Sequence, residues 1–265
     1  EARAAAASAG VPLVPGSGLL SGVDHACEEA ERIGYPVMLK ATGGGGGIGI
    51  SPCEGPDELR EVFARVARLA AANFGDDGVF LERRVRRARH VEVQVIGDGG
   101  GDVVVLGDRD CTLQRRNQKV VEEAPAPNLP DAVREKLART SAELCRSVSY
   151  RSAGTVEFVY DVDRSEAMFL EVNTRLQVEH PVTEQVYGLD LVELMLRVAA
   201  GDPDALHEAR RARPAGAAIE ARVYAEDPER DWRPSPGLIT SVRWAPGVRV
   251  DTWVEAGTEV STAYD

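Results

Sequence analysis

The stretch Phe169-Leu-Glu-Val-Asn-Thr-Arg-Leu-Gln-Val-Glu-His-Pro-Val-Thr-Glu184 carries the most informative pattern of the 265-residue chain. Polar side chains occupy every second position and alternate with Leu, Val and Thr; they are Glu171, Asn173, Arg175, Gln177 and Glu179. Such an alternation predicts an extended strand with one apolar and one polar face. Its acids could hold a divalent metal, its guanidinium could clamp an oxyanion, and its last carboxylate could act as a base. A half-buried strand with a solvated face would show the same alternation.

Composition narrows the class of protein. The chain is long enough for one large or two small domains. Its formal net charge of -12 disfavours nucleic acid and anionic membranes as partners. The four cysteines are widely spaced and the histidines lack a zinc-ligand spacing, which fits a reducing cytoplasm and argues against a structural zinc. No apolar run approaches the length of a membrane span. Because the chain starts at Glu1 and stops abruptly at Asp265, we expect a fragment of a longer polypeptide.

The order of elements predicts an α+β fold with antiparallel sheets, because hairpins alternate with helices. Helical patterns with caps occur at residues 24–33, 56–74, 131–147 and 190–200. Short strands are expected at 36–40 and 79–82, and hairpins at 90–96 with 102–106 and at 154–160 with 168–178. Residues 114–130 read as a basic loop and a proline-rich turn, and residues 218–265 as strands separated by turns.

A run of five glycines, Gly43–Gly47, follows the strand expected at 36–40 and its last residue, Lys40. Each glycine costs chain entropy on folding, so the run indicates close approach of the backbone to a ligand, with N–H groups for phosphate oxygens. The spacing matches neither the P-loop nor the dinucleotide-binding fingerprint. A flexible linker is the alternative interpretation.

Three further segments carry polar groups that could serve a ligand. Glu82, at the end of a short apolar strand, and the backbone that follows could meet an adenine amino group. His90, Glu92 and Gln94 share one face of a strand, and residues 114–119 form a cationic loop that would favour phosphate or bicarbonate. A charged turn, a solvated hairpin face and a surface loop are the respective alternatives.

The expected hairpin of residues 154–160 and 168–178 would place Glu157 beside Glu171. Two carboxylates so close repel each other unless a cation lies between them. Together with Asn173 they offer the oxygen ligands that magnesium prefers.

These segments together resemble the ATP-grasp fold and, within it, the biotin carboxylase family. Four segments carry the resemblance in the family's order: residues 34–49, 109–127, 171–184 and 222–227. It implies two α+β lobes that grip a nucleotide. Residues 1–40 would begin the ATP-grasp region, 41–110 would form a lid subdomain with the glycine-rich loop and a hairpin, and 111–215 would form the catalytic lobe. Residues 216–265 would start a β-rich C-terminal subdomain.

The resemblance also implies a role for each matching residue. ATP would contact Lys40, Gly43, Gly44, Gly45, Gly46, Gly47, Gly49, Glu82, Val85, His90 and Gln114. Magnesium, or manganese, would be held by Glu157, Glu171 and Asn173. Bicarbonate would lie among Lys119, Arg175, Gln177 and Val178, and Glu179 would be the base that deprotonates it. Arg222 would stabilise the enolate of biotin, which makes Lys119, Arg175, Glu179 and Arg222 the expected catalytic residues.

The implied activity is that of a ligase. ATP and bicarbonate would form carboxyphosphate, which would supply carbon dioxide to biotin on a carrier domain outside this chain. A carboxyltransferase domain in the same polypeptide or complex would be a further partner. Homologous modules often dimerise, so a homo-oligomer is compatible with the resemblance. The expected location is the cytoplasm.

Departures from the family pattern bear on the branch and on activity. The preceding N-terminal domain and a biotin attachment sequence are missing, which leaves open whether the isolated fragment is active. Asn117 replaces a common His and Ile50 a common Met. Asn117 and the segments 115–119, 128–130, 231–237 and 249–259 resemble the urea carboxylase branch, which includes guanidine carboxylases, whereas His180-Pro181 follows the general pattern.

Three alternatives remain for the function. The module could serve an acyl-CoA or pyruvate carboxylase, which the downstream domains would decide. A carbamoyl-phosphate-forming enzyme shares bicarbonate phosphorylation, but the context of Arg222 argues against it. A non-catalytic nucleotide-binding remnant would have no physical reason to keep the costly polar set Lys119, Glu157, Glu171, Arg175 and Glu179.

Overall fold

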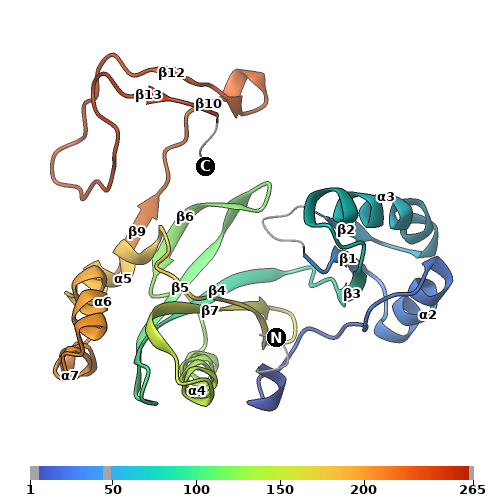
Figure 1. Cartoon of the computed structure of the whole chain (residues 1–265), viewed down its shortest axis with the longest axis horizontal. Coiled ribbons are helices and arrows are strands. Elements are labelled where there is room, and N and C mark those ends of the chain that lie inside the picture. Colours follow the sequence, from blue (N-terminus) through green and yellow to red (C-terminus); the bar gives the residue numbers. More distant parts are fainter. Residues whose placement is uncertain (1–5, 44–48, 263–265) are drawn as a thin grey trace. The chain divides into compact units, whose positions relative to one another are not determined.

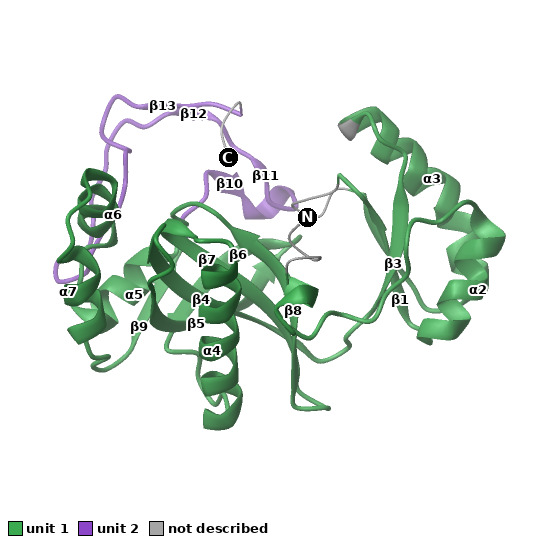
Figure 2. Cartoon of the chain, turned by 60° about the horizontal axis from the view of Figure 1, so that its bottom comes forward, with its two compact units in different colours: residues 1–221 green, residues 222–265 purple. Residues whose placement is uncertain are grey.

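The computed structural model describes residues 6–43 and 49–262. The chain divides into two compact units, residues 1–221 and residues 222–265 (Figure 2). Among the described residues, none of the helices combines the length and the apolar character that a membrane crossing requires.

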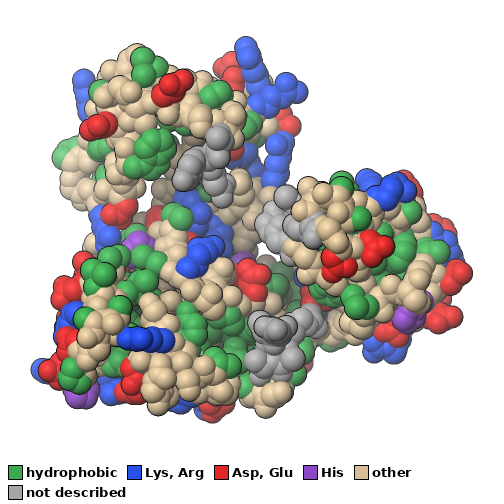
Figure 3. All heavy atoms as spheres, viewed as in Figure 1, with side chains coloured by type: hydrophobic (Ala, Val, Ile, Leu, Met, Phe, Trp, Pro, Cys, Tyr) green, Lys and Arg blue, Asp and Glu red, His purple; other side chains and the backbone are tan. Residues whose placement is uncertain are grey.

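A small three-stranded antiparallel sheet forms the first part of unit 1 (Figure 1). Its order is β2-β1-β3, and the strands are β1 (Val37–Ala41), β2 (Ile50–Cys53) and β3 (Val79–Arg83). Helices α2 (Val23–Ile33) and α3 (Pro56–Phe74) bury Ala26, Ala30, Leu59 and Val66 in one cluster with Leu39 of the sheet. Charged side chains of both signs remain on the visible outer surface of this part (Figure 3).

A six-stranded antiparallel sheet in the order β8-β7-β4-β5-β6-β9 carries the rest of unit 1. The strands are β4 (Ala88–Asp98), β5 (Val103–Arg115), β6 (Gln118–Ala124), β7 (Arg151–Asp161), β8 (Glu166–Asn173) and β9 (Ala218–Ala221). Alternate side chains of β4 point to opposite faces of this sheet. One face is apolar at Val91, Val93 and Val95, and the other is polar at Glu92 and Gln94.

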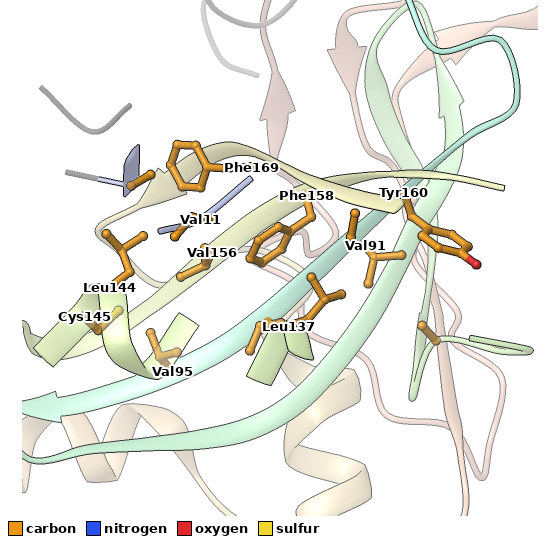
Figure 4. Packing of buried hydrophobic residues seen from close by; sticks show 14 of the residues in the cluster. Val11, Val91, Val95, Leu137, Leu144, Cys145, Val156, Phe158, Tyr160 and Phe169 are labelled. Carbon is orange, nitrogen blue, oxygen red and sulfur yellow. The ribbon is translucent and has the colours of Figure 1, made fainter. Parts of the chain in front are cut away.

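Helix α4 (Asp131–Ser147) covers the apolar face (Figure 4). Leu137 and Leu144 of this helix pack in one cluster with Val91, Phe158 and Phe169, and the two aromatic rings meet edge to face at 6.4 Å. The opposite face is covered by α5 (His180–Tyr187), α6 (Leu191–Ala200) and α7 (Ala205–Arg211). The helices expected at 56–74 and 131–147 are thus confirmed, and α5 and α7 were not anticipated.

Strand β5 contains an extra residue at Gly107 that changes which face its side chains reach. Val95 pairs with Val105, whereas Val93 pairs with Asp108, so two residues of β5, Leu106 and Gly107, lie opposite the single residue Gln94 of β4. One class of β-bulge has a glycine in the left-handed conformation, and Gly107 has φ 71°. A Cβ there would come within 2.7 Å of the Tyr187 hydroxyl. Beyond this bulge, Asp108 faces α4 and Arg109 faces the polar side.

The strand expected to run to residue 178 is wrong beyond Asn173. β8 ends there, and residues 174–179 form a bend and a turn that lead into α5. Pro181 lies in the first turn of that helix, where its fixed φ and missing N–H favour helix initiation. Arg175, Gln177 and Glu179 therefore lie on a connection rather than on a strand face.

The basic loop expected at residues 114–130 is also wrong in its first part. β5 continues to Arg115 and β6 begins at Gln118, joined by a two-residue turn at Arg116 and Asn117 with φ 52° and 66°. Positive φ at both central residues is typical of a tight hairpin turn. The lid subdomain expected at residues 41–110 was to include a hairpin. The β4–β5 hairpin instead belongs to the large sheet, because β4 also pairs with β7.

Unit 2 consists of short elements. β10 (Glu226–Asp227) pairs with β11 (Arg233–Pro234) around the 3-10 turn Pro228–Arg230, and β12 (Gly237–Leu238) pairs with β13 (Glu259–Val260). Several of its large apolar side chains are exposed, including Trp253 at 69%. The tail expected from residue 218 to be strand-rich contains strands, but beyond β9, which belongs to unit 1, they are only two residues long.

Candidate active site

A row of charged side chains crosses the large sheet on its polar face. Arg109 of β5 is paired in register with Glu92 of β4, Glu92 with Glu157 of β7, and Glu157 with Glu171 of β8. Arg109 and Glu92 are completely buried and Glu157 is 3% exposed, whereas Glu171 is exposed. The expected cross-strand placement of Glu157 beside Glu171 is therefore confirmed. The two buried carboxylates of this row, Glu92 and Glu157, need nearby positive charge to remain ionised.

Lys119 supplies much of that charge. Its ammonium donates to Glu92 Oε2 at 2.7 Å, to Glu157 Oε1 at 2.9 Å and to Glu179 Oε1 at 2.6 Å. The β5–β6 hairpin brings Lys119 over the row, and the turn before α5 brings Glu179 to it. One nearly buried ammonium thus joins three carboxylates from three separate segments.

Burial and charge act in opposite directions on these groups. Burial alone would lower the pKa of Lys119, but Glu92, Glu157 and Glu179 outweigh it and raise that pKa well above its ordinary value. Burial alone would raise the pKa of Glu157, but hydrogen bonds and charge from His90 and Lys119 hold it far below its usual range. Burial raises the pKa of the neighbouring Cys111 thiol well above its ordinary value, so this group remains a neutral thiol. At neutral pH Lys119 is therefore a cation and Glu157 an anion.

The three residues expected to hold a metal lie together. Asn173 Nδ2 donates to Glu157 Oε1 at 2.9 Å, and Glu171 is the register partner of Glu157. Two carboxylates and an amide oxygen form a donor set suited to magnesium, and the exposure of Glu171 leaves it within reach of a hydrated ion. The amide of Asn173 would have to turn its oxygen toward such an ion.

The residues expected to contact nucleotide fall into two groups. Lys40 and Glu82 form an ion pair on the small sheet, where Gly49 accepts a backbone hydrogen bond from Ala41. Val85 follows β3, and Gly43 ends the described part before the glycine-rich loop; Gly44, Gly45, Gly46 and Gly47 lie outside the described residues. On the large sheet, His90 Nδ1 lies 3.0 Å from Gln114 Nε2, and His90 Nε2 lies 3.0 Å from Glu157 Oε2. His90 thus connects the expected ribose side with the expected metal side.

The remaining expected residues differ in whether they contact the Lys119 cluster. Gln177 Nε2 donates to Glu157 Oε1 at 2.9 Å, so this amide belongs to the cluster. Val178 is 59% exposed, and Arg175 Nη1 donates at 3.2 Å to the carbonyl oxygen of the adjacent Leu176. Arg222 is the first residue of unit 2.

Two central residues received no role from the sequence. Glu92 appeared only as part of a polar strand face, and Arg109 only as part of a family motif. A signal for Glu92 was present, since it lies between His90 and Gln94 on one face of a strand. No local signal indicated Arg109, because the bulge at Gly107 reverses the face expected from alternation with Val103 and Val105.

Comparison with known families also divides the chain into two parts. Residues 1–207 match the family described as carbamoyl-phosphate synthase L chain, ATP binding domain. Residues 220–265 match the biotin carboxylase C-terminal domain. Both matches together show that the chain belongs to the biotin carboxylase family, and the expected α+β ATP-grasp fold is confirmed.

Relatives extend this result. The urea amidolyase of Lachancea kluyveri is 56% identical over 266 residues, which cover all of this chain and 14% of that protein. The biotin carboxylase domain of Hydrogenobacter thermophilus 2-oxoglutarate carboxylase, solved as a dimer with MgADP, ADP and bicarbonate, is 41% identical with a TM-score of 0.91, covering 99% of this chain and 58% of that one. The urea carboxylase of Kluyveromyces lactis is 50% identical with a TM-score of 0.65, covering 80% and 18%. The chain thus spans a small part of its urea-processing relatives.

The lowered pKa of Glu157 predicts how stability depends on pH. A carboxylate whose pKa is depressed by folding stabilises the native state above its unfolded pKa of about 4.3 and loses that contribution as the pH falls toward its folded value. We expect Glu157→Gln to flatten the decrease in unfolding free energy between about pH 5 and pH 3. Urea unfolding followed by circular dichroism at several pH values measures this slope. The exposed Glu166→Gln should keep the wild-type slope, and equal slopes for all three proteins would contradict the role of Glu157.

Proposed function

We propose that this chain is the biotin carboxylase module of a multidomain urea carboxylase, which uses ATP and bicarbonate to carboxylate biotin on a carrier domain. One observation carries the proposal: Lys119 joins the expected base Glu179 to Glu157, whose other hydrogen-bond donors include Gln177. An anion substrate, a base and an oxygen-rich metal site would then share one preorganised cluster. The match to urea amidolyase over the whole chain supports the choice of parent enzyme.

The cluster is suited to activating bicarbonate as a nucleophile. Lys119 and Arg175 would attract and orient the anion, and Gln177 would add an amide N–H donor. Glu179 would take the proton as bicarbonate attacks the γ-phosphate, a role that requires a carboxylate within hydrogen-bond reach of the anion. Carboxyphosphate would break down to carbon dioxide and phosphate, and the phosphate would take the ureido proton of biotin.

The remaining residues would hold the other reactants. Glu157, Glu171 and Asn173 would bind magnesium, which offsets negative charge on the phosphates when bound. Lys40, Glu82, the glycine-rich loop and the His90–Gln114 pair would hold the nucleotide. Arg222 would provide positive charge for the ureido oxygen of biotin.

Asn117 supports the urea branch through its resemblance in sequence, and the backbone at this position accommodates it. It occupies the second position of the β5–β6 turn with φ 66°, where Asn is among the non-glycine residues that most readily tolerate a left-handed backbone. The turn sets the position of Lys119, two residues further on. The identity of 56% with urea amidolyase points to the same branch.

The proposal is tested by ADP release from the full-length protein in the cytoplasmic pH range. Bicarbonate-dependent release that biotin stimulates would support biotin carboxylation, and urea, guanidine, acyl-CoA or pyruvate added in turn would identify the final acceptor. Stimulation by acyl-CoA or pyruvate alone would assign the module to another carboxylase. Release that needs bicarbonate but ignores biotin would indicate a different ATP-grasp enzyme, and no release would favour a non-catalytic remnant.

Removing the expected base should abolish chemistry while sparing nucleotide binding. In the full-length protein, Glu179→Gln should lower bicarbonate-dependent turnover by at least about 100-fold, since an amide cannot accept the proton. Its affinity for MgADP, measured by isothermal titration calorimetry, should stay within about twofold. Glu135→Gln, an exposed carboxylate on α4, is the control. Wild-type turnover in Glu179→Gln would remove this residue as the base.

The metal assignment predicts a change in magnesium dependence. Glu171→Gln replaces a charged oxygen ligand by a neutral amide, so the magnesium concentration for half-maximal ADP release should rise by about 10-fold. Glu166→Gln, an exposed carboxylate at the other end of β8, should leave it unchanged. The same magnesium titration for Glu171→Gln and the wild type would contradict the metal site.

A further inference from the structure

Arg109 is a completely buried guanidinium that uses its donors on five different side chains. Its Nε donates to Glu92 Oε1 at 2.6 Å, and its Nη1 donates to Gln94 Oε1 at 2.7 Å and to Thr183 Oγ1 at 2.8 Å. Its Nη2 donates at 3.3 Å to both Thr155 Oγ1 and Gln177 Oε1. These partners come from β4, β7, α5 and the turn before α5, so Arg109 ties together the three segments that supply a carboxylate to Lys119.

The chemistry of a guanidinium determines how its partners are oriented. Arginine has five donors and no acceptor, so any amide beside it must present its oxygen. Gln177 therefore turns its NH2 group away from Arg109 and toward Glu157, where Nε2 lies 2.9 Å from Oε1. Gln94 follows the same rule, since its NH2 donates to the carbonyl oxygen of Gly154 at 3.0 Å. Only one of the two hydrogens of the Gln177 amide is needed for Glu157, which leaves a second donor for an anion.

The charge of Arg109 also affects Lys119. Around the ammonium lie Glu92, Glu157 and Glu179, with neutral Cys111 and the ring of His90 beside them. Arg109 binds one oxygen of Glu92 and leaves the other for Lys119. Without the guanidinium, the Lys119 ammonium alone would have to offset the negative charge of three carboxylates. Less of its positive electrostatic field would then be available to attract a bound anion.

We propose that Arg109 is a positioning residue for bicarbonate, which it never touches: it sets the direction of the Gln177 amide and shares the charge of Glu92 so that Lys119 can serve the anion. This inference rests on the proposed function and adds to it the residue that orients the anion site. The bulge at Gly107 is what aims Arg109 at this face, so a backbone irregularity in β5 is coupled to the substrate side of the sheet.

Arg109→Lys in the full-length protein is the test. Lysine keeps the charge but lacks the planar fork, so it cannot hold Glu92 and Gln177 at once. From ADP release, we expect the KM for bicarbonate to rise by about 10-fold and the KM for ATP to change by less than about twofold. Arg134→Lys is the matched control, because Arg134 pairs with Asp108, the neighbour of Arg109 that faces α4, and should leave the KM for bicarbonate unchanged.

A second comparison separates positioning from general destabilisation. If Arg109 acts through Gln177, then Arg109→Lys should raise the KM for bicarbonate much less in a Gln177→Met background than in the wild type. A purely structural role would lower the active fraction and the melting temperature without this coupling. Should Arg109→Lys fail to fold, Thr183→Val removes one acceptor of Arg109 and keeps its charge, and should raise the same KM by about threefold.

The outcomes distinguish the inference from the function on which it rests. A wild-type protein with bicarbonate-dependent ADP release and an unchanged KM for bicarbonate in both Arg109→Lys and Thr183→Val would overturn the role of Arg109 alone. Fully additive effects of Arg109→Lys and Gln177→Met would do the same. A wild-type protein that ignores bicarbonate would overturn the proposed function and this inference together.

Discussion

The contact of one ammonium with three carboxylates is the constraint on which this structure depends most. Lys119 donates to Glu92, Glu157 and Glu179, and the first two of these acids are paired directly across neighbouring strands. Carboxylates packed this way are stable as anions only while their cationic partners, Lys119 and Arg109, stay in place. The large sheet, the β5–β6 hairpin and the turn before α5 therefore have to meet at one point, and the polar face of the sheet is organised around it.

The fold achieves this with two backbone irregularities. The bulge at Gly107 turns Arg109 to the polar face and Asp108 to α4, so consecutive charged residues serve opposite layers. The end of β8 at Asn173 frees the following segment to turn inward, which brings Gln177 and Glu179 to Lys119. Regular strands would have sent these side chains elsewhere, so the site depends on departures from the pattern that builds the sheet.

The same two irregularities explain why the sequence predicted some parts of the structure and missed others. Capping glycines and prolines and apolar periodicity were sufficient for α3, α4 and the β7–β8 pairing of Glu157 with Glu171. The alternation of polar and apolar residues could not indicate where β8 ends, because residues 174–178 continue the same alternation after the strand has ended. Nor could it place Arg109, whose face depends on one glycine. It also missed the hairpin turn at Arg116 and Asn117, because the cationic run of residues 114–119 suggested a loop. Local propensity was overridden where tertiary contacts hold the site together.

The central claim is that this cluster makes bicarbonate the nucleophile toward ATP. Bicarbonate labelled with 18O tests it directly, if the phosphate released by the full-length protein is analysed by mass spectrometry before the label exchanges with water. Attack by bicarbonate on the γ-phosphate and breakdown of carboxyphosphate leave one bicarbonate oxygen on phosphorus, so the account predicts phosphate that carries one 18O atom. Unlabelled phosphate would mean that water attacks ATP, and would contradict the account.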